Sequence, residues 1–180
     1  KKIWLRVSID GDPSCYEYVR AAGNLDKVEE NIKLLNNTLT NTDISATCTV
    51  NLYNITRFTN IVKYFCSLDV YFHSSLVQYP EALNIKLLPA ELKHQITEEF
   101  WAWYNNEAKE YIQDVSVKVD VQKQLDRIKK FATNTLNYMN SEDRNDKWQQ
   151  FLDYSAALDN YHGTNLFDNY SEYRSKENFS

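Results

Sequence analysis

Three short segments in the first half of the chain alternate apolar and polar side chains with a period of two, over residues 3–10, 46–52 and 68–73. Because successive side chains of a β-strand point to opposite faces, each segment is predicted to be a strand with one apolar and one polar face. Apolar residues recur at helical spacing between them, over residues 26–39 and 58–65. Strands joined by crossovers of this length pair in parallel with right-handed connections, so the pattern predicts an α/β fold.

The polar faces indicate where a site can lie. A parallel strand between two layers of helices is apolar on both sides, whereas these strands are apolar on one side only. Helices are therefore expected to cover the apolar side and to leave the polar side facing a cavity. That side carries Arg6, Ser8, Asp10, Thr47, Thr49, Asn51, Asp69 and His73. Parallel sheets bind ligands at the carboxyl ends of their strands, where Ser8, Asp10, Asn51 and His73 fall. A water-exposed sheet face is the alternative.

The second half of the chain has a different pattern. Two of the three prolines lie within residues 74–89, and a short extended piece is predicted over residues 83–87. From there on the apolar spacing is helical, which predicts three helices, at residues 92–103, 121–139 and 148–158. Ser141, Glu142 and Asp143 separate the last two and can cap the third, while Asn24 or Asp26 can cap the helix over residues 26–39. The chain is thus predicted to divide into an α/β region, residues 1–88, and an all-helical region, residues 89–180.

Charge and cysteine content exclude several classes of protein. The 180 residues carry a formal net charge of −5, whereas a free-standing nucleic-acid binder normally shows a basic surplus. Lys129 and Lys130 are accordingly interpreted as a solvated helix face. Cys15, Cys48 and Cys66 are widely spaced and odd in number, which argues against a disulfide framework or a zinc site and fits the cytoplasm. No apolar run approaches the roughly 20 residues of a membrane span, and no signal peptide is expected.

The first strand ends in a group that can bind a ligand. Ser8 and Asp10 are two residues apart on its polar face, and Gly11 follows, where a glycine permits a sharp turn and a close approach of the backbone to a ligand. The hydroxyl and the carboxylate can hydrogen-bond ribose hydroxyls or an α-amino group, although the same residues also suit a simple turn. His73 can act as an acid, a base or a ligand, but it has no partnering His or Cys and is interpreted as a structural histidine.

Two further side chains are candidates for the same cavity. Arg20 can hold a carboxylate through two parallel hydrogen bonds, and a surface ion pair with Glu17 or Asp26 is its alternative role. Asn51 ends the second strand on the inward face and suits an amide contact to a ligand. Asn54, three residues later, is interpreted as the N-cap of the following helix.

Taken together, these segments resemble one family, the radical S-adenosylmethionine enzymes. The segment WLRVSIDGDPSCYEYVRAAGNLDKVEENIKLL (Trp4 to Leu35) resembles the middle of their barrel, where a strand ending in Ser-x-Asp-Gly precedes an Arg and a helix. TCTVNLYNITRF (Thr47 to Phe58) resembles the next strand and turn. LVQYPEALNIKLLPAELKHQI (Leu76 to Ile96) and LDNYHGTNLFDNYSEY (Leu158 to Tyr173) resemble the tail of the twitch-type subgroup.

The resemblance implies the second half of a partial (β/α)6 barrel with parallel strands, followed by a helical twitch-like tail. Members of the family bind S-adenosylmethionine across the top of the barrel, and a [4Fe–4S] cluster cleaves it to methionine and a 5′-deoxyadenosyl radical. By position in the motif, Ser8 and Asp10 would lie near the methionine or ribose, Arg20 would reach the methionine carboxylate, and Asn51 would face the ribose or adenine. The substrate would be a peptide, a tRNA or a small molecule.

The sequence departs from the family in one respect, because it has no CxxxCxxC motif to hold the cluster. The chain begins without Met and runs directly into a strand, so we interpret it as the C-terminal portion of a longer protein whose N-terminal half carries the cluster. By itself it would be inactive. Two alternatives remain open, namely a non-enzymatic half-barrel that serves as a binding or scaffold module, and an unrelated α/β enzyme with a small-molecule cavity.

Overall fold

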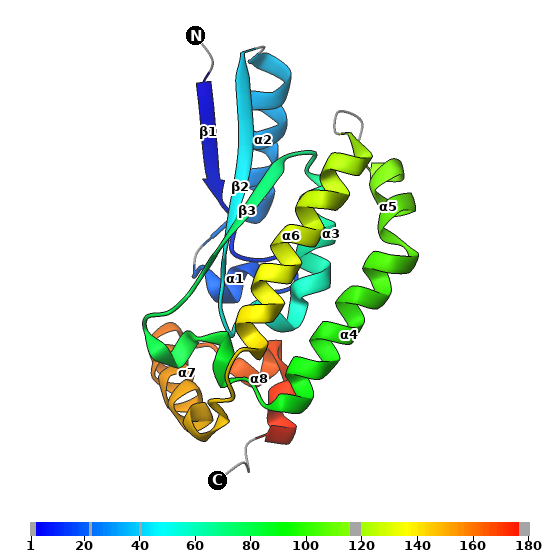
Figure 1. Ribbon diagram of the computed structural model, residues 1–180. Coiled ribbons are helices and arrows are strands. Elements are labelled where there is room, and N and C mark those ends of the chain that lie inside the picture. The colour runs from blue at the N-terminus through cyan, green and yellow to red at the C-terminus, as the bar shows by residue number, and fades with distance from the viewer. Residues whose placement is uncertain (1–2, 22, 40, 116–119, 177–180) are drawn as a thin grey trace.

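The sheet has the topology that the alternating segments predict. The computed structural model describes residues 3–21, 23–39, 41–115 and 120–176. In this part of the chain three parallel strands pair in the order β1 (Ile3–Ser8), β2 (Thr42–Val50) and β3 (Tyr71–Leu76) (Figure 1). The register places Ser8 opposite Thr47, and Thr47 opposite His73. The parallel pairing and the helical crossovers confirm the coarse prediction of a parallel α/β fold. The described strands form an open sheet and do not close into a barrel.

Helices connect the strands, as the long crossovers require. The first crossover contains α1 (Tyr16–Val19) and α2 (Leu25–Thr38), and the second contains η1 (Ile55–Arg57) and α3 (Phe58–Ser67). Of the two candidate caps for α2, Asn24 is the one that acts, because its side chain accepts a hydrogen bond from the backbone N–H of Lys27 at 2.8 Å.

The two faces of the sheet differ as the sequence predicts. The apolar side chains of β2, at Ile44, Ala46, Cys48 and Val50, are all buried, and Phe72 of β3 is buried with them. The intervening side chains remain at least partly accessible to solvent, and Arg6, Ser8 and His73 are exposed. One side of the sheet therefore packs on helices and the other is largely open, in agreement with the predicted polar face.

The connection after β3 corrects one prediction. Residues 83–87, expected to be extended, form parts of two 3-10 turns, η2 (Glu81–Leu83) and η3 (Ile85–Leu87). The side chain of Asn84 accepts a hydrogen bond from the N–H of Lys86 at 3.0 Å, which turns the backbone back on itself. Ile85 and Leu87 are both buried in this conformation. The short apolar alternation here reflects burial of a turn and not a strand.

The elements described in the C-terminal region are all helices. The three predicted helices are α4 (Ala90–Asn106), α6 (Val121–Asn140) and α7 (Trp148–His162), and the sequence analysis did not include α5 (Ala108–Val115) or α8 (Leu166–Asn169). Instead of a cap at residues 141–143, a 3-10 turn, η4 (Asn145–Lys147), leads into α7, whose start has no side-chain cap.

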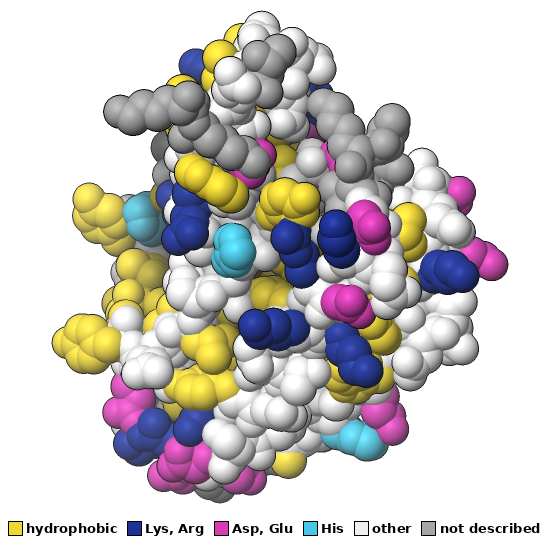
Figure 2. Space-filling model, turned by 45° about the horizontal axis from the view of Figure 1, so that its top comes forward, with side chains coloured by type: hydrophobic (Ala, Val, Ile, Leu, Met, Phe, Trp, Pro, Cys, Tyr) yellow, Lys and Arg dark blue, Asp and Glu magenta, His cyan; other side chains and the backbone are white. Residues whose placement is uncertain are grey.

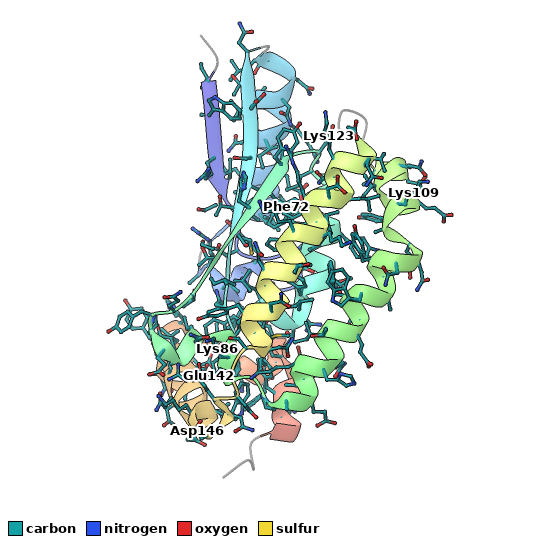
Figure 3. All side chains as sticks on the ribbon, viewed as in Figure 1. Phe72, Lys86, Lys109, Lys123, Glu142 and Asp146 are labelled. Carbon is teal, nitrogen blue, oxygen red and sulfur yellow. The ribbon has the colours of Figure 1, made fainter. Side chains whose placement is uncertain are left out.

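The hydrophobic core continues from the sheet into the helices without interruption. Phe58 of α3 stacks on Phe131 of α6 and contacts Phe100 of α4, with ring centroids 5.2 and 5.1 Å apart. Phe72 of β3 meets Phe131 edge to face at 5.4 Å, which fixes α6 beside the outer strand (Figure 3). Residue 88 therefore marks a change in secondary structure, and one core spans both sides of it.

The last helices return to the carboxyl ends of the strands (Figure 1). Tyr173, in η5 (Ser171–Lys176), donates its hydroxyl hydrogen to the carbonyl of Leu52 at 2.6 Å, and Tyr53 hydrogen-bonds Ser155 of α7 at 3.0 Å. Leu52 and Tyr53 lie in the turn that follows Val50, the last residue of β2. The C-terminal segment thus closes the molecule below the edge at which parallel sheets bind ligands. No described helix combines the length and apolar character needed to cross a membrane.

Candidate functional site

The carboxylate of Asp10 joins the carboxyl end of β1 to β2 and to the end of α1. Arg20, which follows α1, donates to Asp10 Oδ2 from Nε and Nη2, at 2.9 and 2.6 Å. The backbone N–H of Thr49 donates to Asp10 Oδ1 at 2.8 Å. The Arg20 side chain is 42% exposed and that of Asp10 11%, so water screens the ion pair from the arginine side. The partner of Arg20 is Asp10 and neither of the two acids expected for a surface pair.

Asn54 corrects a further prediction. It occupies the N-cap position of η1, but its side chain makes no capping hydrogen bond. Instead, its Nδ2 donates to the carbonyls of Asp10 and Thr49, both at 2.9 Å, and its Oδ1 accepts the N–H of Asn51 at 2.9 Å. Asn54 is fully buried. Buried backbone groups at the ends of two neighbouring strands need hydrogen-bond partners. The amide of Asn54 is the partner of three such groups at once.

Asn51 belongs to the same network through the backbone of β2. Its Nδ2 donates to the carbonyl of Thr49 at 3.1 Å, and its Oδ1 accepts the N–H of Tyr53 at 2.8 Å, which forms a tight turn after the strand. The side chain is 6% exposed. The structure therefore brings together three of the four predicted site residues, Asp10, Arg20 and Asn51, in one network at the carboxyl edge.

Ser8 lies outside this network, one step back along the open face. It is exposed on β1 and pairs across the sheet with Thr47, which in turn pairs with His73. His73 is exposed as well, and it lies on the open face of β3 instead of at its carboxyl end. The row from Ser8 to His73 thus leads away from Asp10 toward the far side of the sheet.

Gly11 is required by a close approach within the chain itself. A Cβ atom at this position would lie 2.6 Å from Sγ of Cys15 and 3.3 Å from the backbone of Tyr16. Asp12 holds this loop in place, since its Oδ1 accepts both the N–H and the hydroxyl hydrogen of Ser14, at 3.1 and 2.6 Å. The Ser-x-Asp-Gly sequence thus packs α1 tightly against the end of β1.

Comparison with known proteins does not assign this chain to a family. Family models, curated proteins and solved structures were searched, and none matches this chain. The radical S-adenosylmethionine family therefore stays a prediction that rests on the segments quoted above and on the network just described.

The three cysteines are free, buried and unsuited to bind a metal ion. Burial is the main cause of the raised pKa of each thiol, to about 12 for Cys15 and about 11 for Cys66, and well above its ordinary value for Cys48. Metal ligation needs the thiolate, which these surroundings disfavour. Among the described residues, no group of three or more His, Cys, Asp or Glu side chains is placed to hold a metal ion.

A second site was missed by the sequence analysis. A cavity of about 940 Å³ lies over the amino-terminal half of the open sheet face, where α6 overhangs β3. Arg6, His73, Arg127 and Lys130 are among its lining residues, and none of Ser8, Asp10, Arg20 and Asn51 is. Figure 2 shows basic side chains gathered around a histidine on this side of the molecule. Arg6 and His73 were placed on the polar face from the sequence, but only the packing of α6 on the sheet brings Arg127 and Lys130 to them.

Proposed function

We propose that this chain is the C-terminal portion of a radical S-adenosylmethionine enzyme and binds that cofactor at the carboxyl ends of β1 and β2. The observation that carries the proposal is the Asp10–Arg20 pair, which is anchored to the backbone of β2 at the edge where parallel sheets bind ligands. A pair fixed in this way presents an arginine in one orientation, which favours recognition of a planar carboxylate.

The polar groups of the network retain capacity for a ligand. A guanidinium has five N–H donors, and Arg20 uses two of them on Asp10, which leaves three for the methionine carboxylate. Asn51 keeps one N–H of its amide, since the other donates to Thr49. Ser8 has an exposed hydroxyl on the adjacent part of the face. Asp10 is more deeply engaged, so we assign it mainly to holding Arg20, with its remaining lone pair directed to the ribose or the α-amino group.

On this proposal the cluster belongs to a segment outside the sequence given. The buried, protonated thiols of this chain do not fit a [4Fe–4S] cluster, so no step of the chemistry is assigned to it here. The open sheet agrees with a half-barrel, because β1 has β2 as its neighbour on one side and no described strand on the other. A further strand could pair with that edge and continue the barrel.

Binding of S-adenosylmethionine, measured by calorimetry, tests the proposal. Arg20→Gln should weaken binding by roughly tenfold or more, because a charged hydrogen-bonded pair with the carboxylate is lost. Arg174→Gln is the matched control, since Arg174 also faces an aspartate, Asp168 at 3.5 Å, but at an exposed site in η5. Equal affinities for Arg20→Gln and Arg174→Gln would contradict the assignment of Arg20, and an unmodified protein that binds no cofactor would refute the proposal.

The reading frame that precedes Lys1 provides a separate test. The proposal requires it to encode further strands and a CxxxCxxC motif. If translation starts near Lys1, a non-enzymatic half-barrel becomes the better interpretation. One observation already favours that second candidate, namely that Asp10, Asn51 and Asn54 are largely satisfied by the chain itself, as groups with a purely structural role would be.

A further inference from the structure

The cavity on the open sheet face is built from four elements, the three strands and α6, which are far apart in the sequence. Its floor is made by the amino-terminal half of the sheet, and its side by the exposed flank of α6. Arg6 extends from β1 and His73 from β3, while Arg127 and Lys130 lie one turn apart on α6. Phe72 and Phe131, in contact at 5.4 Å, hold the helix at this distance from the strand.

The charges around this cavity are not balanced within the described chain. Arg6, Arg127 and Lys130 are basic side chains, and none of them forms an ion pair with a described carboxylate, whereas Asp43 is the single acidic side chain among the lining residues. Such a concentration is unexpected in a protein of net charge −5. Like charges that surround one cavity repel one another. A cluster of basic side chains without acidic partners therefore favours the binding of an anionic ligand.

Two details show that the cations are positioned close to the cavity. The guanidinium of Arg127 lies over the ring of Tyr71, with Cζ 3.7 Å from the ring centroid, which fixes the arginine against β3. His73, between Arg6 and Arg127, has a lowered pKa, caused first by desolvation and then by those two charges. A neutral imidazole can donate one hydrogen bond and accept another, so it adds a polar contact without adding to the repulsion.

We infer that this cavity binds a nucleotide-sized molecule that carries at least two phosphate charges, such as a nucleoside diphosphate. Arginine matches phosphate oxygens through parallel N–H donors, and Lys130 adds a mobile point charge. A volume of about 940 Å³ is within the usual range for small-molecule sites. Trp4 also lines the cavity and is 71% exposed, so it presents an aromatic surface against which a planar base can pack. This inference does not depend on the proposed function, because it uses none of the residues of the carboxyl edge.

Calorimetric titration with ADP tests the inference. In the double variant Arg127→Gln/Lys130→Gln the affinity for ADP should fall by about tenfold or more, since two charge-assisted contacts are lost. The matched control is Lys123→Gln/Lys129→Gln, which removes the same charge from exposed positions of α6 that do not line the cavity. The control should bind ADP within about twofold of the unmodified protein, and both variants should keep its thermal midpoint, which shows that they fold.

Several outcomes would overturn the inference. Equal losses in the double variant and its control would mean that only net charge matters. Adenosine binding as tightly as ADP would show that the cations are not used, and absence of ADP binding would remove the site altogether. A single-stranded oligonucleotide that binds where ADP does not would replace the small molecule by nucleic acid. Arg20→Gln separates this site from the proposed cofactor site, because it should leave the affinity for ADP unchanged whether or not S-adenosylmethionine binds.

Discussion

The carboxyl edge of the sheet and its open face use charge in opposite ways. At the edge, Asp10 faces Arg20, and the neighbouring amides are bonded to backbone groups of β1 and β2. On the open face, Arg6, Arg127 and Lys130 meet around one cavity without a described carboxylate as ion-pair partner. The edge is a set of matched groups, and the face is a set of unmatched ones.

This difference teaches which region contributes to folding and which is available for binding. Buried polar groups stabilise a fold only when each has a hydrogen-bond partner. If one partner is removed, the other is left buried without a hydrogen bond, which costs free energy. Unmatched exposed cations do the reverse, since they repel one another and cost a little stability. Substitutions at the edge should therefore destabilise the protein, whereas substitutions on the face should not.

The largest effect is expected for Asn54→Ala. The substitution leaves the carbonyl of Asp10 and the N–H of Asn51 without their Asn54 partner at a buried site, while the carbonyl of Thr49 keeps its hydrogen bond from Asn51. Each buried group left unsatisfied costs about 1–3 kcal/mol, and water that enters the site offsets part of this cost. The free energy of unfolding should therefore fall by roughly 3–5 kcal/mol. Urea denaturation measures it.

Asn145→Ala is a matched control for this substitution. Asn145 begins η4 at an exposed position, and its backbone N–H, which the substitution retains, donates to Asp143 at 3.3 Å. It should cost less than about 0.5 kcal/mol, the usual range for an exposed site. A similar cost for the two variants would mean that the network at the carboxyl edge has little energetic role.

Gly11→Ala should have the next largest effect. The new methyl group would lie 2.6 Å from Sγ of Cys15, so α1 must shift away from the end of β1, at a cost of about 1–3 kcal/mol. Adding Cys15→Ala removes the nearest obstacle, and the double variant should lose less stability than the sum of the two single variants. Strict additivity in this cycle, measured by denaturation, would place the cause of the loss elsewhere.

The carboxyl edge could largely be predicted from the sequence because it is made from short-range groups. Period-two alternation gave the strands, and the crossover lengths gave parallel pairing, which places Asp10 beside Thr49 and Asn51. The role of Asn54 was wrong because an N-cap and a bridge between strand ends use the same residue type. The choice between them depends on which backbone groups lie within reach, and that is a property of the folded chain.

The open face could be predicted only in part. Arg6 and His73 were placed on it by alternation, but the interpretation of Lys130 as a simple solvated position did not include the sheet that α6 overhangs. Helical spacing shows which side of α6 is apolar, and it does not show which strand that side packs against. That contact depends on Phe72 and Phe131, which are distant in sequence. Residues 83–87 were wrongly predicted to be extended for a related reason, because burial of Ile85 and Leu87 mimics strand alternation.

A much smaller effect is expected on the open face. Arg127→Gln/Lys130→Gln relieves repulsion with Arg6, although it also removes the contact of Arg127 with the Tyr71 ring. The two terms nearly cancel at an exposed site, so the free energy of unfolding should change by less than about 0.5 kcal/mol. A loss of several kcal/mol in urea denaturation would show that these cations have a structural role, like the groups of the edge.

The smallest expected effect is a pH dependence that originates at His73. Desolvation and the charges of Arg6 and Arg127 hold its pKa in the folded protein below the ordinary value of 6.5. The unfolded chain therefore binds the proton more readily than the folded protein does. The contribution of His73 to the free energy of unfolding is fully present above about pH 6.5, and it is lost as the pH falls through the folded-state pKa. His73→Gln has no proton to take up, and its thermal midpoint should fall less than that of the unmodified protein between about pH 7 and about pH 5.

His94, exposed on α4 beside Glu98, is the matched control, and His94→Gln should not reduce the fall in thermal midpoint. If His73→Gln follows the same pH curve as the unmodified protein, the cations of the open face do not act on His73, and the contrast between the unmatched face and the matched edge loses its electrostatic basis.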